Sequence, residues 1–250
     1  MFAFRMAKGL EKADRAGRAL RLGLGVGLTA GWATLIEYPA APAAMILAGY
    51  AVLNAWRSGL RSVWQVAFGV FLGAIVCITI LATYNLIAFH SALTVGYKYQ
   101  VFFPETAQGI LGITYPKPRV MAKLLVHPYR GLLLTAPVLL LAPVGLLILW
   151  RNARTRWHSV VLAAIPLYYF LLNASYVNWF GGSCYGPRYL FPGLFFLAPA
   201  LAMIWTSWPR VRALPLGLSA VGLTLALIAV PTTPMPNEAW ADTIPGGSIC

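Results

Sequence analysis

One arginine among aromatic rings marks the part of this sequence best suited to bind a ligand, residues 179–189. The stretch reads Trp-Phe-Gly-Gly-Ser-Cys-Tyr-Gly-Pro-Arg-Tyr and lies between two long apolar runs. Glycine and proline at this density cannot continue a helix, so the backbone bends here. Arg188 offers a planar fork of donors that matches phosphate, and Trp179 and Tyr185 accompany it. An aromatic belt at a membrane surface would explain the two rings without a ligand.

A second group of cations precedes this stretch in the chain. Arg119, Lys123 and His127 follow Pro118 at intervals of four residues, so a helix that begins at Pro118 carries all three on one face. Together with Arg130 and the arginine of the first stretch, they form a candidate phosphate-binding set. The alternative is an ordinary interfacial helix whose cations reach lipid head groups.

The other face of this predicted helix is apolar. Val120, Met121 and Leu124 are expected to point toward lipid. The pattern therefore predicts an interfacial helix that keeps its cations at the level of the head groups.

Carboxylates are scarce, and only one of them is a candidate catalytic group. The sequence holds six acidic residues, with no Asp-x-Asp and no adjacent acidic pair. Glu37 lies at the end of an apolar run, where an unpaired charge near lipid is unfavourable. We expect it either to pair with a cation or to act as a base toward an acceptor hydroxyl. No cluster of cysteine, histidine or acidic residues has metal-ligand spacing, so the residues themselves predict no metal and no cofactor.

The composition indicates a membrane protein. Of all residues, 60% are hydrophobic and 10% are charged, whereas about a quarter of a soluble domain is charged. Several apolar runs approach the ~20 residues that a helix needs to cross a bilayer. We therefore predict an all-α polytopic bundle with the lipid bilayer as its first partner. The net charge of +13 sits mainly in short loops between apolar runs, so no nucleic acid is predicted.

Seven apolar runs are predicted to form the spans of one bundle, residues 22–230. They cover residues 22–36, 40–56, 63–87, 131–150, 160–176, 191–205 and 214–230. The first is short for a span, and the fourth is expected to bend at Pro137 and Pro143. In the first run Gly23, Gly27 and Gly31 recur every four residues, a spacing that lets a neighbouring helix pack closely in lipid.

Basic residues in the short loops set the predicted orientation. Loops rich in lysine and arginine stay cytoplasmic, and 13 of the 19 basic residues gather on one side if seven spans alternate. The amino terminus is then inside, with a basic cytosolic leader at 1–21, and the carboxy terminus is outside. An extracytoplasmic segment at 90–130, a loop at 177–190 and a tail at 231–250 also lie outside. The candidate site residues all belong to this outer face.

Three further residue patterns concern packing and modification. Cys77 lies within a predicted span and is expected to pack as a small apolar residue. Cys184 and Cys250 both lie outside in this topology, where a disulfide is permitted, and their pairing stays open. Asn173 begins an Asn-Ala-Ser triplet, which matches a glycosylation acceptor but falls in a predicted span.

Three segments resemble motifs of bacterial membrane glycosyltransferases. They are residues 27–39 (Gly-Leu-Thr-Ala-Gly-Trp-Ala-Thr-Leu-Ile-Glu-Tyr-Pro), 127–133 (His-Pro-Tyr-Arg-Gly-Leu-Leu, with Pro137 beyond) and 179–189. They look like the protein-mannosyltransferase type, glycosyltransferase family 39, of the GT-C superfamily. The resemblance runs from about Gly23 to Ala200 and covers the later part of such a protein. It implies a GT-C-like bundle in the bacterial plasma membrane and transfer of a sugar from a polyprenyl-phosphate donor to an unknown acceptor on the outer face. It also allows a divalent metal.

The sequence departs from this family in its carboxylates. Members of the superfamily carry acidic residues in the first extracytoplasmic loop, and one of them serves as base or metal ligand. Here the outer acidic residues are Glu37, Glu105, Glu238 and Asp242, and the first of these does not belong to the family's catalytic loop. We expect the chain to be a carboxy-terminal fragment of such an enzyme. The alternative is a non-catalytic polytopic membrane protein: a lipid-binding subunit, a transporter or a glycosyltransferase remnant.

Overall fold

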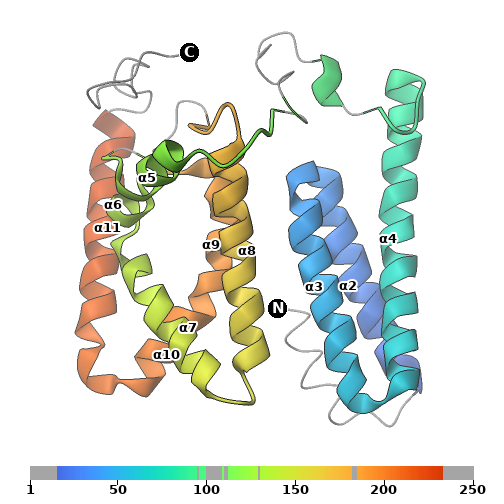
Figure 1. The fold of residues 1–250 in the computed structure, drawn as a ribbon, viewed down its shortest axis with the longest axis horizontal. Coiled ribbons are helices and arrows are strands. Elements are labelled where there is room, and N and C mark those ends of the chain that lie inside the picture. Colours follow the sequence, from blue (N-terminus) through green and yellow to red (C-terminus); the bar gives the residue numbers. More distant parts are fainter. Residues whose placement is uncertain are drawn as a thin grey trace. The chain divides into compact units, whose positions relative to one another are not determined.

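The chain folds into α-helices joined by short 3-10 turns (Figure 1). The structure, a computed structural model, describes residues 16–94, 96–99, 109, 112–128, 130–181 and 185–232. Within these ranges no strand occurs, and the one β-type contact is an isolated bridge between Ile113 and Tyr176. The chain forms two compact units, Met1–Gln100 and Val101–Cys250. The leader before residue 16, the tail after residue 232 and the Cys184–Cys250 pair lie outside the described residues.

Three α-helices of the first unit fall within its described residues. They are α2 (Ala16–Ile36), α3 (Ala41–Ala55) and α4 (Leu60–Phe89), with 3-10 turns η1 (Tyr38–Ala40), η2 (Trp56–Ser58) and η3 (Gly96–Tyr99). The predicted stop of the first helix at Pro39 is confirmed, since α2 ends at Ile36 and the proline opens η1. The prediction of a short first span is wrong. The helix begins at Ala16, inside the predicted leader, because alanine and arginine favour helix and Arg21 Nε donates to the Gly17 carbonyl at 3.1 Å.

Small residues from both helices build the contact between α2 and α4. A Cβ on Gly27 would overlap the backbone carbonyl of Val70, and one on Gly31 would lie 2.8 Å from the Cβ of Cys77. The same close backbone approach occurs at Gly23, Gly69 and Gly73. Gly23 meets Val66, Gly27 meets Val70 and Gly31 meets Cys77. Because the residue numbers rise together on both helices, α2 and α4 run parallel. The predicted role of the glycine stripe in close packing is confirmed, as is the packing role of Cys77, which is 3% exposed.

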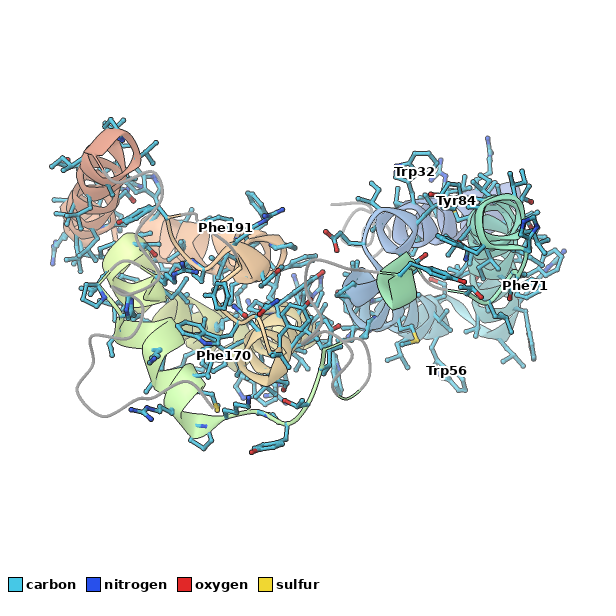
Figure 2. All side chains as sticks on the ribbon, turned by 90° about the horizontal axis from the view of Figure 1, so that it is seen from above. Trp32, Trp56, Phe71, Tyr84, Phe170 and Phe191 are labelled. Atoms are coloured by element: carbon cyan, nitrogen blue, oxygen red, sulfur yellow. The ribbon has the colours of Figure 1, made fainter. Side chains whose placement is uncertain are left out.

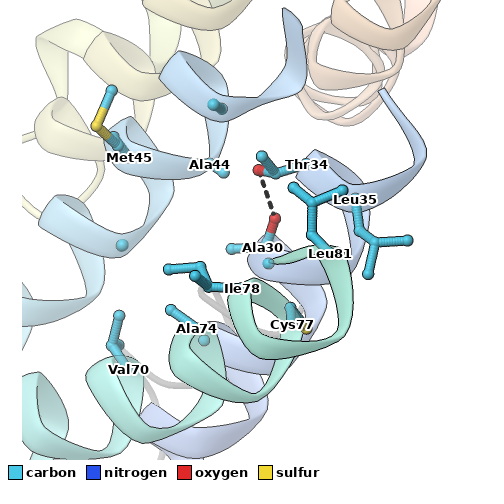
Figure 3. A pocket seen from close by; sticks show the side chains of 14 residues that line it. Ala30, Thr34, Leu35, Ala44, Met45, Val70, Ala74, Cys77, Ile78 and Leu81 are labelled. Atoms are coloured by element: carbon cyan, nitrogen blue, oxygen red, sulfur yellow. Dashed lines mark hydrogen bonds between the residues drawn. The ribbon is translucent and has the colours of Figure 1, made fainter. Parts of the chain in front are cut away.

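Large apolar side chains cover the outside of the first unit. Figure 2 shows Trp32, Trp56 and Phe71 pointing away from the helices, and each is more than half exposed. An outer surface of this kind suits hydrocarbon. Between α2, α3 and α4 lies an apolar groove of about 270 Å³, seen in Figure 3. Thr34 on its wall donates its hydroxyl hydrogen to the Ala30 carbonyl at 3.0 Å, so the groove offers little polar chemistry.

Seven α-helices of the second unit fall within its described residues. They are α5 (Pro118–Val126), α6 (Leu132–Thr135), α7 (Ala142–Arg151), α8 (Arg156–Ser175), α9 (Phe191–Leu194), α10 (Ala198–Ser207) and α11 (Ala213–Thr232). The 3-10 turns are η5 (Pro137–Leu141), η6 (Arg188–Leu190), η7 (Phe195–Leu197) and η8 (Pro209–Val211). The helices pack along α8, which contacts both α7 and α9.

Two of the predicted spans in this unit are interrupted helices. The first breaks at Pro137, where α6 gives way to η5, as predicted. Pro143 causes no second break, because it sits in the first turn of α7, where a proline removes no helical hydrogen bond. The second interrupted segment runs through α9, η7 and α10. The two segments meet where a Cβ on Gly145 would overlap the carbonyl of Ala200.

The apolar helices indicate an integral membrane protein. Among the residues that the structure describes, five helices are long and apolar enough to cross a bilayer: Gly17–Ile36, Leu60–Phe89, Arg156–Ser175, Arg188–Ser207 and Pro209–Pro231. The shorter helices α3 and Pro137–Arg151 lie at the other two of the seven apolar runs predicted as spans. The count of seven spans and the orientation stay predictions.

The second unit has two chemically different ends. One end, the α5 end, carries α5, the residues after α8 and the start of η6 (Figure 1). The other end, the arginine-loop end, carries the turn between α7 and α8 and the turn between α10 and α11. The predicted site residues of this unit lie at the α5 end. Successive connections of the unit therefore lie at opposite ends, as expected if its spans cross a bilayer in alternating directions.

Candidate functional site

The helix predicted after Pro118 is present as α5. Lys117 is its N-cap residue, Pro118 opens the first turn, and the helix ends at Val126. Proline suits this position because its fixed φ is already helical and its missing N–H needs no partner there. His127 follows with extended backbone angles, so it leaves the helical face predicted for it.

Residues just before α5 fasten it to the end of α8. The backbone N–H of Thr114 donates to the Ser175 carbonyl at 2.8 Å, and that of Lys117 donates to the Ala174 carbonyl at 3.1 Å. The Thr114 hydroxyl also donates to Ser175, at 2.9 Å. The last carbonyls of a helix lack partners within the helix. Their use here holds α5 across the end of α8.

The apolar face of α5 packs inside the protein and not against lipid, so the prediction of a lipid-facing stripe is wrong. Val120 and Leu124 are 8% and 1% exposed and form a cluster with Ala174 and Leu190. Met121 packs against the same cluster. The periodicity of α5 is typical of either environment. Ala174 at the end of α8 and Leu190 in η6 supply the buried apolar surface that covers it.

Lys123 connects α5 to the aromatic stretch at 179–189. Its ammonium nitrogen lies 5.4 Å from the centroid of the Trp179 ring, within the range of a cation–π contact. Trp179 itself packs on the α5 cluster. Arg119, one turn earlier, is exposed. The two segments singled out in the sequence, about 55 residues apart, therefore form one structure.

Arg130 makes the second connection. Its side chain is 5% exposed, its Nη1 donates to the Phe180 carbonyl, and its guanidinium carbon lies 5.4 Å from the Phe180 ring centroid. Its backbone N–H donates to His127 Nδ1 at 3.3 Å. The arginine thus holds the stretch after α8 through both a hydrogen bond and a ring contact.

Arg188 stands on the exposed side of the same structure. It opens η6 and is exposed. Gly181 has φ +67°, a conformation that favours glycine, and a Cβ there would lie 3.3 Å from the Arg188 Cβ. Tyr176 and Tyr189 stack edge to face nearby, with centroids 5.4 Å apart. The chain therefore folds back so that the exposed arginine adjoins the segment held by Arg130. Tyr185 is half-buried.

The site is cationic throughout its described part. The sequence's six acidic residues are Glu11, Asp14, Glu37, Glu105, Glu238 and Asp242, and none of them belongs to the described residues of the second unit. Burial lowers the pKa of His127, and the positive charges of Arg130 and Lys123 lower it further. A neutral imidazole agrees with the hydrogen bond that its Nδ1 accepts.

This arrangement predicts a loss of stability in mild acid. The pKa of His127 in the folded protein lies below its ordinary value of 6.5, so the unfolded chain binds more protons between the two values. Stability is therefore full above about 6.5 and falls as pH drops through the folded pKa. His127→Asn keeps an acceptor near Nδ1 but cannot titrate. Thermal unfolding between pH 7.5 and 5 should show a smaller loss for this variant than for the wild type. An equal loss would contradict the assignment.

Glu37, the predicted catalytic candidate, lies in the first unit. It is exposed and is the N-cap residue of η1, with no side-chain capping hydrogen bond. Its pairing with an outer cation and its role as a base both stay predictions. Within the described ranges, no three histidine, cysteine or acidic side chains gather as metal ligands.

Asn173 is a residue whose importance the sequence did not reveal. It lies in the last turn of α8, is 1% exposed, and neither Oδ1 nor Nδ2 has a hydrogen-bond partner among the described residues. Buried amides of this kind are unfavourable without a partner. Its burial also argues against the Asn-Ala-Ser triplet as a glycosylation acceptor, since the amide is 1% exposed. The one sign of this in the sequence is an amide side chain within an apolar run.

Comparisons with protein-family models, curated proteins and solved structures find no match for this chain.

Proposed function

We propose that the chain carries the donor-binding part of a GT-C-like membrane glycosyltransferase, which uses a polyprenyl-phosphate-linked sugar on the extracytoplasmic face of a bacterial plasma membrane. One observation carries the proposal. Lys123 and Arg130 hold the aromatic segment that adjoins the exposed Arg188, at one end of an apolar helical unit. Such a place suits a ligand with a long apolar chain and a phosphate head.

The cations have a direct chemical use in sugar transfer. An acceptor hydroxyl oxygen would attack the anomeric carbon as the bond from that carbon to the phosphate oxygen breaks. Polyprenyl phosphate leaves with the bonding electrons, and the hydroxyl proton passes to a carboxylate. Guanidinium groups stabilise the negative charge that grows on the departing phosphate. Arg188 is the exposed ligand, and Arg130 and Lys123 position the segment beside it. Glu37 stays the predicted candidate for this base.

A divalent metal does not fit the described part of this site. Its charged groups are lysine and arginine, which repel a cation, and its one histidine is buried and bonded to Arg130. We therefore derive no step through a metal.

The second candidate is a non-catalytic subunit that binds the lipid phosphate. The lack of any carboxylate among the described residues of the second unit favours it. The two functions differ in one measurement, because a binding subunit holds the donor but transfers no sugar to any acceptor.

Substitution of Arg188 tests its proposed role in binding phosphate. Arg188→Ala is expected to weaken binding of polyprenyl phosphate by roughly 10–100-fold, because a hydrogen bond to a charged group contributes about 1.5–3 kcal/mol. Fluorescence binding to the purified chain in neutral detergent measures this. Arg210→Ala is the matched control, since Arg210 is also an exposed arginine in a three-residue 3-10 helix, at the opposite end. Unchanged affinity in a folded Arg188→Ala protein would refute the role.

A further inference from the structure

The arginine-loop end of the second unit contains the same tryptophan–arginine arrangement twice. In the first, the guanidinium carbon of Arg156 lies 5.4 Å from the Trp150 ring centroid, and its Nε donates to the Trp150 carbonyl at 3.4 Å. In the second, the guanidinium carbon of Arg212 lies 5.3 Å from the Trp205 ring centroid, and its Nε donates to the Trp205 carbonyl at 3.0 Å. In each pair, a ring near the end of one helix holds an arginine at the entry to the next, Arg156 at the start of α8 and Arg212 just before α11.

The two pairs lie at the same depth. The helices α7 and α10 pack together where Gly145 meets Ala200, and both run toward the arginine-loop end (Figure 1). Trp150 and Trp205 each follow that contact by five residues. A rise of 1.5 Å per residue places both about 7.5 Å beyond it. Two fixed guanidinium groups therefore flank the ends of two packed helices.

This end carries positive charge without a counter-ion from the described part of its own unit. Its five arginines, all exposed, are Arg151, Arg154, Arg156, Arg210 and Arg212. No acidic residue belongs to the described residues of the second unit. Arg156 and Arg212 each use Nε toward a carbonyl and one face toward a ring. Both residues are exposed, and these contacts leave the Nη nitrogens available to meet an anion.

We propose that this end is a binding site for the phosphate of an anionic phospholipid, with Arg156 and Arg212 as its ligands. A guanidinium matches phosphate in two-pronged geometry. Tryptophan concentrates at the boundary between lipid and water, and basic pockets between membrane helices bind anionic head groups. The apolar helices that end at the two tryptophans point to a lipid as the source of the phosphate. The proposal is independent of the sugar-transfer function, since it concerns the opposite end of the unit.

Lipid titration of the purified full chain in neutral detergent tests this site. Phosphatidylglycerol should raise the thermal unfolding midpoint of the wild type, whereas phosphatidylcholine should not. The double variant Arg156→Gln/Arg212→Gln should need at least about tenfold more phosphatidylglycerol for the same rise, because it loses two charged hydrogen-bond donors. Arg151→Gln/Arg154→Gln removes the same charge from the same end and should respond like the wild type.

Each of the following outcomes would overturn the proposal. Equal weakening in both double variants would show diffuse charge attraction without a site. If neither double variant weakens the stabilisation by phosphatidylglycerol, the two arginines are not its ligands. If inorganic phosphate at the same concentration raises the unfolding midpoint as much as phosphatidylglycerol does, the site does not select a lipid. If the glutamine pair fails to fold, Arg156→Lys/Arg212→Lys decides the matter, because lysine keeps the charge but not the fork. Lipid protection as strong as in the wild type would then contradict the proposal.

Discussion

Arg130→Ala is expected to release the aromatic stretch from the α5 end and to weaken donor binding. The change removes a buried guanidinium that donates to the Phe180 carbonyl and stacks on its ring. A carbonyl left without its partner in a buried place destabilises a protein by about 1–3 kcal/mol. Gly181 in the segment after α8 lies against Arg188. Movement of this segment should therefore also displace Arg188.

Hydrogen exchange measured along the chain separates this local effect from general destabilisation. Amides of residues 176–181 should exchange faster in Arg130→Ala, whereas those of α2 and α4 should not change. Arg130→Met keeps much of the side-chain volume and should give the same exchange pattern, since the charged head makes the contact. Arg154→Ala removes an exposed arginine from the other end and should leave the segment protected. Unchanged exchange at 176–181 in Arg130→Ala would contradict this role.

The second large effect is expected from one methyl group on Gly27. Its Cβ would overlap the Val70 carbonyl, so α2 and α4 would have to separate along their shared stripe. Overpacking of this kind destabilises by roughly 1–3 kcal/mol, although alanine favours helix over glycine by up to about 1 kcal/mol. We expect Gly27→Ala to lower the thermal unfolding midpoint in detergent by several degrees.

Gly49 provides a matched control for this substitution. It lies in α3, and a Cβ there meets no atom within 4 Å. Gly49→Ala should therefore leave stability unchanged or raise it slightly through helix propensity alone. A loss of equal size in both variants would show that the contact between α2 and α4 contributes nothing specific.

The sequence predicted much of the helical framework because its signals are local. Apolar runs, the stop at Pro39, the break at Pro137 and the helix start at Pro118 all depend on residues within one turn of each other. The start of α2 at Ala16 was missed, since two arginines suggested a solvated leader. Their long side chains can reach polar surroundings from within a helix.

The site was harder to predict because its contacts are distant in sequence. Arg130 and Phe180 are 50 residues apart, and no spacing rule pairs them. The sequence singled out both segments, and the structure brings them into contact. Apolar periodicity could not tell lipid from protein as the partner of Val120 and Leu124, since both environments favour the same residues. Asn173 looked unimportant until its burial showed an amide without a partner among the described residues.

The most direct test of the proposed function compares polyprenyl phosphate with the same polyprenol lacking the phosphate. Binding of each to the purified full chain is measured in neutral detergent, with excess phosphatidylglycerol present to occupy the arginine-loop end. We expect the phosphate to increase affinity at least about tenfold, since it can meet Arg188 directly. Equal affinity for the two lipids would contradict a phosphate-binding site at the α5 end.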